Sequence, residues 1–218
     1  MPSNATTSEN ETWGRQHVSL AEAVAGVDPG KDGYHVKVTN KATTTLAGIG
    51  SIPLVAFLDA SDLEHLEDLG DVVQCTSLRA INLSLWSKDD KLKDITPLGG
   101  FLNLQELNVD GRKGLSDITP LARLSSLERL CLRNCTGVRS VEPLLAIRTL
   151  RQLDLLGSMV ESLEPLVDLP GLTDLTAMSY ALPSLKGAPV VWLEKLRLTC
   201  PHGWNQFLSP GSNVPIAR

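Results

Sequence analysis

The chain has 218 residues and a net charge of −5, and 42% of its residues are hydrophobic while 21% are charged. This composition can bury a core and excludes an intrinsically disordered polymer. The acidic balance disfavours a surface tuned to nucleic acid phosphates or anionic lipid, and the chain lacks the run of roughly 18 apolar residues that a membrane span needs.

Residues 1–32 are polar and rich in Ser, Thr, Asn, Glu and Gly. Only residues 19–27, SLAEAVAGV, have a helical pattern, with Ser19 as a plausible cap. We expect either a terminal cap or partner-binding arm, or a flexible leader with one loosely docked helix. The segment has no apolar signal core, and Glu9 and Glu11 are unlike a transit peptide, so we expect an intracellular, cytoplasmic protein.

An internal repeat dominates the chain from residue 33 to residue 200. Leucine occurs 38 times, and 35 of these residues fall between Leu54 and Leu198. Units of the form L-x-x-L-x-[LV] begin at Leu78, Leu104, Leu127, Leu150, Leu172 and Leu193, with spacings of 26, 23, 23, 22 and 21 residues. Two weaker units precede them, so we expect about eight rungs, the outer ones degenerate, over residues 33–200.

Each unit predicts a strand followed by a tight turn. Numbered from the first leucine, positions four and six are apolar, as in Leu130 and Leu132, which predicts a short strand with one buried face. Apolar residues then recur every third position, which suits three-residue turns leading to the next strand. Proline recurs in these turns, and Thr96 and Thr119 directly before it are candidate caps. Because no unit can bury its own apolar edge, neighbouring units must stack.

The unit that begins at Leu78 is lengthened by residues 84–90, SLWSKDD. We expect a loop that protrudes beside the sheet, with Trp86 either exposed or packed against the rung. Asp89 and Asp90 beside lysines could suggest a metal site, but no further oxygen ligands cluster there, so we interpret the loop as solvated.

After residue 200 the repeat ends. In residues 201–218, Trp204, Phe207 and Leu208 could form a partial cap over the last rung, whose apolar side chains and strand edge would otherwise be open.

The four cysteines are Cys75, Cys131, Cys135 and Cys200. On one extended segment Cys131 and Cys135 would lie roughly 13 Å apart, too far for a disulfide. We expect four reduced, mostly buried thiols.

Motifs that carry chemistry are scarce. The four histidines are far apart, and no HExxH, GxSxG or glycine-rich phosphate loop is present. We therefore expect no catalytic residues, no metal site and no cofactor.

The expected sheet surface is electrically mixed. At the outward positions two, three, five, seven and eight, the cations are Arg79, Arg129, Arg133, Arg151, Lys195 and Arg197, and the anions are Glu106, Asp110, Glu128, Asp154, Asp174 and Glu194. Opposite charges on neighbouring rungs are predicted to pair at Glu106 and Arg129, at Glu128 and Arg151, and at Asp174 and Lys195. Such pairs either satisfy one another as surface ladders or take part in partner recognition.

Large apolar residues interrupt this charged surface. Leu156 and Met178 occupy position seven on adjacent rungs, and Leu85 lies in the neighbouring column. They either form a binding centre flanked by Arg133 and Asp154, or are buried by a drift in strand register. The candidate partner-binding residues are Leu156, Met178, Arg133, Asp154, Arg129, Arg151 and Trp86.

The repeat resembles the leucine-rich repeat family in its short form of about 22 residues. The phrases SDITPLARLSSL and TGVRSVEPLLAI look like internalins and phosphatase-regulatory leucine-rich repeat proteins, and residues 104–170 are most similar to leucine-rich repeat proteins of kinetoplastid protozoa. The resemblance implies an α/β solenoid, a right-handed superhelix with a parallel β-sheet on the concave face and short helical or 3-10 turns on the convex face.

The sequence departs from the family at the column that is usually asparagine. That column holds Trp86, Arg112, Cys135, Ser158, Tyr180 and Pro201. Without an asparagine ladder to satisfy the turn backbone, we expect irregular turns that contain water.

These features favour a non-catalytic protein-protein interaction scaffold that binds a protein partner on its concave face. The alternatives are a regulatory subunit of a serine/threonine phosphatase and a structural subunit of a large assembly. The phosphatase-regulatory proteins present acidic and aromatic residues on the concave face, which this mixed surface lacks. We expect neither a nucleic acid partner nor a membrane partner.

Overall fold

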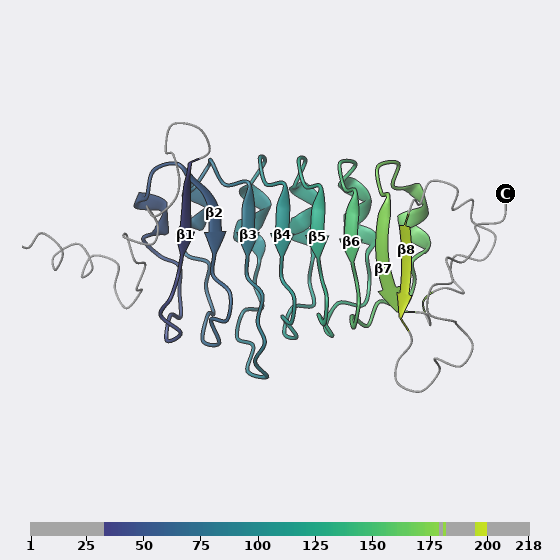
Figure 1. Ribbon diagram of the computed structural model, residues 1–218, viewed down its shortest axis with the longest axis horizontal. Coiled ribbons are helices and arrows are strands. Elements are labelled where there is room, and N and C mark those ends of the chain that lie inside the picture. The colour runs from purple at the N-terminus through teal and green to yellow at the C-terminus, as the bar shows by residue number, and fades with distance from the viewer. Residues whose placement is uncertain (1–32, 179–180, 182–194, 200–218) are drawn as a thin grey trace, which may run out of the picture.

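The chain forms a solenoid in the computed structural model, which describes residues 33–178, 181 and 195–199. Parallel strands make one layer, and short 3-10 helices make the opposite layer (Figure 1). The expected terminal segments, 1–32 and 201–218, lie outside the described residues.

In the described part of the chain, the sheet has eight strands whose order in the sheet is their order in the sequence. They are β1 (Tyr34–Lys37), β2 (Val55–Asp59), β3 (Ala80–Asn82), β4 (Glu106–Asn108), β5 (Arg129–Cys131), β6 (Gln152–Asp154), β7 (Asp174–Met178) and β8 (Lys195–Thr199). The 3-10 helices of the same residues are η1 (Ile49–Ser51), η2 (Val72–Gln74), η3 (Thr96–Gly100), η4 (Thr119–Arg123), η5 (Glu142–Ala146) and η6 (Glu164–Asp168).

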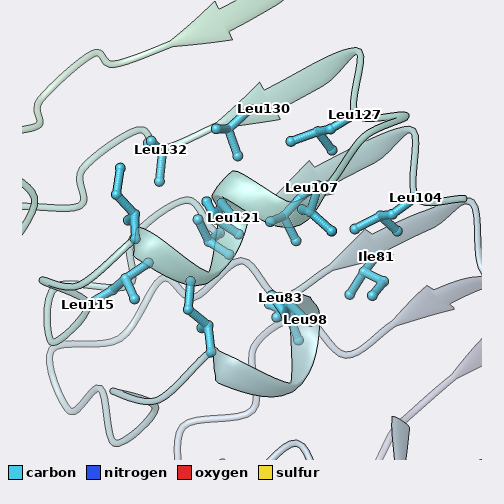
Figure 2. Packing of buried hydrophobic residues seen from close by; sticks show 14 of the residues in the cluster. Ile81, Leu83, Leu98, Leu104, Leu107, Leu115, Leu121, Leu127, Leu130 and Leu132 are labelled. Atoms are coloured by element: carbon cyan, nitrogen blue, oxygen red, sulfur yellow. The ribbon is translucent and has the colours of Figure 1, made fainter. Parts of the chain in front are cut away.

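Columns of stacked leucines form the core. Position four places Leu107 opposite Leu130 and Leu130 opposite Leu153, and each of the three is only 2% exposed. Figure 2 shows Leu107 and Leu130 on the side of their strands that faces Leu98 and Leu121, which come from η3 and η4. Each rung therefore buries the apolar edge of the next, as predicted, and the burial of each column depends on the register of its neighbours.

The caps of the 3-10 helices differ from the prediction, because Thr96 and Thr119 are not the capping residues. Instead, Asp94 and Asp117 accept hydrogen bonds of 2.8 Å from the backbone N–H groups of Thr96 and Thr119. Hydrogen bonds from the side chain and backbone of each threonine lower the pKa of the aspartate two residues before it. The residue whose side chain caps the turn is therefore two positions earlier than the sequence interpretation placed it.

Ser140 and Ser162 fill the same capping position in the next two repeats. Their hydroxyl oxygens accept hydrogen bonds of 3.2 and 3.1 Å from the backbone N–H groups of Glu142 and Glu164. In these four repeats the capping residue is therefore an Asp or Ser that lies three residues before the proline.

The turns after the strands are also more regular than predicted. Position eight has a positive φ in four repeats, with 56° at Asp62, 77° at Gly111, 54° at Asn134 and 74° at Gly157. Glycine, asparagine and aspartate tolerate this left-handed conformation, so the same turn recurs although the asparagine column is lost.

Three unlike side chains perform the bonding expected of asparagine. In the asparagine column, Arg112 Nε donates to the Leu83 carbonyl (2.6 Å), and the Cys135 thiol donates to the Val109 carbonyl (3.1 Å). Ser158 instead donates to a carbonyl of its own rung, that of Leu155 (2.7 Å). The expectation of irregular turns was wrong. A guanidinium, a thiol or a hydroxyl at this position donates the hydrogen bond to a backbone carbonyl in place of an asparagine amide.

We predict that Leu130→Asp strongly destabilises the protein, because it places an unpaired charge in a column of buried leucines. The expected loss is about 3 kcal/mol or more in the free energy of unfolding, measured by urea denaturation. The control is Gln152→Asp, which adds the same charge at an exposed position of the next strand. Wild-type stability of Leu130→Asp would contradict the strand register.

Candidate functional site

The outer surface of the sheet forms a groove of about 590 Å³ that runs across β2 to β7. Position three contributes Phe57, Ala80, Glu106, Arg129, Gln152 and Asp174 to its lining. Position five contributes Asn82, Asn108, Cys131, Asp154 and Thr176. Because side chains alternate along a strand, these two positions point away from the leucine core and form the floor of the groove.

A row of side-chain-to-backbone hydrogen bonds fixes one border of the groove. At position five, the side-chain oxygens of Asn82, Asn108 and Asp154 each accept a hydrogen bond from the backbone N–H two residues later, at 3.1, 2.9 and 2.9 Å. Asp59 makes the same bond on the preceding strand, at 3.1 Å. Cys131 interrupts the row with a thiol. The row was not recognised in the sequence, although Asp or Asn at a fixed position after a strand leucine is its signal.

Ion pairs neutralise much of the charge on the sheet surface. The predicted pair of Glu106 and Arg129 is present, and both side chains are about half exposed. An additional pair joins Arg133 to Asp154, whose Oδ2 accepts hydrogen bonds from Nε (3.2 Å) and Nη2 (2.9 Å). Such exposed pairs contribute at most about 1 kcal/mol each, so their main consequence is a surface without a dominant sign.

The other two predicted pairs have different outcomes. No ion pair joins Glu128 to Arg151 among the described residues, where Arg151 is exposed. Asp174 lies opposite Lys195 in the register of β7 and β8, as the repeat alignment predicted.

Leu156 and Met178 lie beside the groove and outside its described lining. Both are half-buried, and the pairing of β6 with β7 is regular, so the alternative of burial by a drift in strand register is wrong. Whether they form a binding centre stays a prediction. The backbone N–H of Leu156 donates to Asp154 Oδ1 (2.9 Å), so Leu156, Asp154 and Arg133 form one connected group.

The apolar end of the groove was missed in the sequence. Phe57 packs its ring against His35, with centroids 5.3 Å apart at an angle of 53°. Ala80 lies between Phe57 and Glu106 in the register and leaves the ring beside a small side chain. The signal was the alignment of Val55 with the first leucine of later units, which places Phe57 at position three.

The loop after β3 exposes Trp86 and buries its neighbour. Trp86 is 76% exposed, whereas Leu85 is only 2% exposed and donates its backbone N–H to the Asp110 carbonyl (2.7 Å). The expectation that Leu85 belongs to an exposed apolar centre was therefore wrong. Leu85 is at position eight of its repeat and lacks the positive φ that this position has in four other repeats, so its turn differs from theirs.

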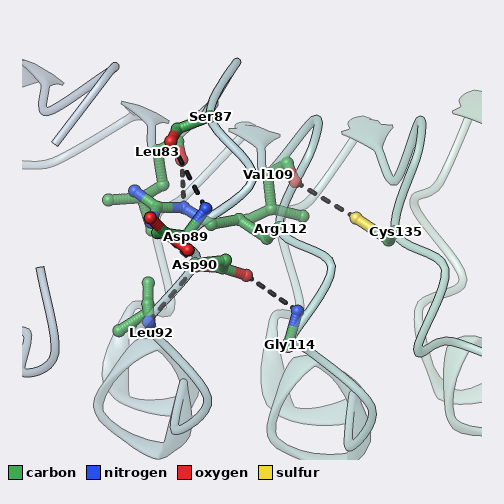
Figure 3. Close-up of polar contacts among 9 residues, drawn as sticks. All are labelled: Leu83, Ser87, Asp89, Asp90, Leu92, Val109, Arg112, Gly114 and Cys135. Atoms are coloured by element: carbon green, nitrogen blue, oxygen red, sulfur yellow. Dashed lines mark hydrogen bonds and ion pairs between the residues drawn. The ribbon is translucent and has the colours of Figure 1, made fainter. Parts of the chain in front are cut away.

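The prediction of a solvated Asp90 is also wrong, because its side chain is only 2% exposed and forms an ion pair with Arg112. Arg112 Nη1 donates to Asp90 Oδ1 (3.1 Å), and the backbone N–H of Gly114 donates to Asp90 Oδ2 (2.8 Å). Arg112 Nε reaches back to Leu83 at the start of the loop (Figure 3). One buried arginine therefore connects both ends of the inserted loop to the next rung.

Three of the four cysteines lie in the described part of the chain, and all three are free thiols. Desolvation by burial raises the pKa of Cys75 and Cys131 to about 11 and that of Cys135 to about 12. These thiols are therefore protonated near neutral pH and are poor nucleophiles or metal ligands. Cys200 lies outside the described residues.

The described residues contain no group of three or more His, Cys, Asp and Glu side chains that could hold a metal ion. Nor do they contain a helix of the length and hydropathy that a membrane span requires.

The comparisons with known proteins place the fold. No family model matches the chain, and no curated protein sequence matches it. Its structure is similar to internalin C2 of Listeria monocytogenes str. 4b F2365, with a TM-score of 0.55 and 22% identity over 75% of this chain and 80% of that one. A second internalin of this strain, inlF, has a TM-score of 0.48 and 23% identity over 65% of this chain and 50% of that one.

The architecture is that of a leucine-rich repeat solenoid, with a parallel sheet on one face and 3-10 turns on the other. The internalin part of the expected resemblance is thereby supported at the level of the fold.

We predict that Asp90→Ala lowers the free energy of unfolding by about 3–5 kcal/mol, because it leaves the buried Arg112 guanidinium without its partner. Asp89→Ala is the matched control, since Asp89 is the exposed neighbour in the same loop, and it should change little. The double variant Asp90→Leu/Arg112→Met should recover part of the loss. Urea unfolding measures all three, and equal stabilities of Asp90→Ala and Asp89→Ala would contradict the buried pair.

We predict that Cys131 reacts with a thiol reagent roughly 100-fold more slowly in the folded protein than an unperturbed thiol, since its pKa is raised from 9.0 to about 11. Its labelling rate should rise about tenfold per pH unit below that pKa, because only the thiolate reacts. Because the pKa values of the buried thiols are raised in the folded protein, they favour the folded state below pH 9. This contribution to stability is lost as the pH rises toward 11.

In denaturant, all four cysteines should react without prior reduction. Mass spectrometry of the labelled protein counts the reacted cysteines. Comparison with Cys131→Ser identifies which part of the labelling kinetics belongs to Cys131. Fewer than four labels would reveal a disulfide, and a pH-independent rate would contradict the raised pKa.

Proposed function

We propose that this chain is a non-catalytic scaffold that binds a protein partner along the groove of its concave sheet. The observation that carries the proposal is the groove itself, about 590 Å³ in volume, whose lining from β2 to β7 includes the outward residues of positions three and five on these strands. A concave surface of this kind can accept an extended segment or the edge of a folded domain.

The electrostatics of the groove favour a protein over a nucleic acid. Glu106 pairs with Arg129 and Asp154 with Arg133, so no continuous stripe of one sign runs across the strands. Binding to phosphates requires such a stripe, because its affinity comes from several cations that act together. A mixed surface instead suits a partner whose charges are also mixed.

The binding energy is expected to come from groups that are not already paired. Among the described residues, the Gln152 side chain is exposed in the groove and has no hydrogen-bond partner, and Phe57 offers an aromatic surface. Leu156 and Met178 add two half-buried apolar side chains at the border, beside Arg133 and Asp154. Arg129 is already paired, and Arg151 lies at the rim. Both should therefore affect the orientation of the bound partner more than its affinity.

Two narrower proposals rest on the sequence. We propose an intracellular location, where reducing conditions would keep Cys75, Cys131 and Cys135 as free thiols. We also propose that residues 104–170 are related most closely to kinetoplastid leucine-rich repeat proteins. The roles of phosphatase-regulatory subunit and assembly subunit remain alternatives, and both of them also require a protein partner.

Gln152→Trp tests the groove, because it places a large side chain on the groove floor at an exposed position. We expect capture of partners from native extract, quantified by mass spectrometry, to fall by at least about tenfold. Leu102→Trp is the matched control, since Leu102 is 61% exposed and lies outside the groove lining. Capture of one dominant phosphatase or of a set of assembly subunits would decide between the alternatives.

The double variant Leu156→Ser/Met178→Ser tests the apolar border. A leucine and a methionine desolvated together contribute about 2–4 kcal/mol, so capture should fall by roughly 30- to 1,000-fold. The melting temperature should fall only slightly, because both side chains are half-buried. Charge reversal at Glu128 and Arg151 should have a smaller effect that shrinks with added salt. Normal capture by both the groove variant and the border variant would refute binding on the concave face.

A further inference from the structure

The loop after β3 carries the most exposed large hydrophobic side chain of the described residues. Trp86 is 76% exposed, compared with 61% for Leu102 and 55% for Leu54. Figure 1 shows this loop reaching beyond the loops that follow the neighbouring strands. An indole exposed to solvent on this lengthened loop points to a binding role, because tryptophan is among the residues that most often dominate binding energy.

The exposure of Trp86 does not come from a loosely held loop. On one side of it, the backbone N–H of Leu85 donates to the Asp110 carbonyl at 2.7 Å. On the other side, Asp90 is buried and accepts hydrogen bonds from Arg112 and Gly114. Only four residues, 86–89, lie between these two attachment points, so Trp86 is held in place before any partner arrives.

Backbone packing reinforces the same arrangement. Gly111 adopts a φ of +77°, and a Cβ atom at this position would collide with the carbonyl oxygen of Leu85. The next rung therefore approaches the loop closely, and a side chain at Gly111 would displace the residue next to Trp86. Arg112 binds both ends of the loop, and Gly111 leaves no room between the loop and the next rung.

Lysines follow Trp86 closely in the sequence of the loop. Lys88, Lys91 and Lys93 are exposed, and none of them forms an ion pair in the described structure. Over residues 84–94 the carboxylates are Asp89, Asp90 and Asp94, and Asp90 is already neutralised by Arg112. The exposed charges of the loop are therefore three lysines against Asp89 and Asp94, a small positive excess on a chain whose net charge is −5.

We propose that Trp86 anchors a second interaction surface, the Trp86 loop (residues 84–94), which takes a protein partner whose apolar cleft is bordered by carboxylates. The indole supplies the apolar surface to be desolvated, and the lysines complement the acidic rim of the cleft. Because the loop is ordered beforehand, little conformational entropy is lost on docking.

An anionic membrane is the rival occupant, since tryptophan with lysines also suits lipid headgroups. The acidic residues of the preceding rung disfavour binding to an anionic membrane. The residues between β2 and η2 include the exposed Glu67 and Asp68, together with the partly exposed Glu64. These carboxylates lie one rung before the Trp86 loop. A flat anionic surface that contacts the loop would also approach these carboxylates and be repelled by them. A protein cleft can contact the loop alone, because it covers only one or two rungs.

Photocrosslinking tests the proposal in the full chain. Trp86 is replaced by p-benzoylphenylalanine, and the matched control carries the same residue in place of Leu102. We expect position 86, but not position 102, to crosslink a protein whose crosslinked peptide is rich in Asp, Glu and apolar residues. The yield should fall at least fivefold in 0.5 M salt or when Lys88→Glu/Lys91→Glu is added.

The identified partner then allows a binding measurement. Trp86→Ser should weaken its affinity by roughly 30-fold or more, as expected for a central tryptophan, and Leu102→Ser should change it less than twofold. The melting temperature of Trp86→Ser should equal that of the wild type, because the side chain is exposed.

Four outcomes would overturn the proposal. They are an absence of crosslinks at position 86, an intramolecular crosslink to residues 1–32 or 200–218, a crosslinked peptide that is basic, and sedimentation with phosphatidylserine vesicles that depends on Trp86. A partner that Gln152→Trp releases but Trp86→Ser does not would support the groove while refuting the loop.

Discussion

Every feature of this molecule depends on the stacking of one rung against the next. Leu104, Leu127 and Leu150 begin successive repeats and are completely buried, yet each is covered by residues of adjacent rungs as well as of its own. The strands pair in register, so a residue inserted within a strand would move a whole column out of the core. Variation is therefore confined to the outward positions of the strands and to the loops at the edges, where the groove and the Trp86 loop lie.

The inserted loop shows how an extra segment is accommodated without disturbing that stacking. The spacing of 26 residues leaves the leucine columns intact and puts the additional residues at the sheet edge. Its attachment uses a buried ion pair between Asp90 and Arg112, although Arg112 Nη2 is left without a hydrogen-bond partner in the described structure. Because burying two charges costs desolvation energy, the pair is better explained by the positioning of the loop than by net stability.

The features that could be predicted are those set by the spacing of one residue type. Leucine periodicity was enough for the sheet, its register and the pair of Glu106 and Arg129, since each depends on counting residues from the first leucine. The burial of Asp90 could not be predicted, because it depends on Arg112 in the next rung, in a column usually filled by asparagine. The half-burial of Leu156 and Met178 depends on how closely neighbouring side chains cover them, and periodicity carries no information about that.

The two proposed surfaces are connected through β3. Ala80 and Asn82 line the groove, and Asn82 also accepts a hydrogen bond from Ser84, where the inserted loop begins. Trp86 is four positions after Asn82, so their Cα atoms lie within about 14 Å even if that segment is fully extended. A typical interface buries about 800 Å² on each partner, which is wide enough to span this distance. One folded partner could therefore enter the groove at β3 and contact Trp86 as well, and the rigid attachment of the loop would then fix the angle of docking.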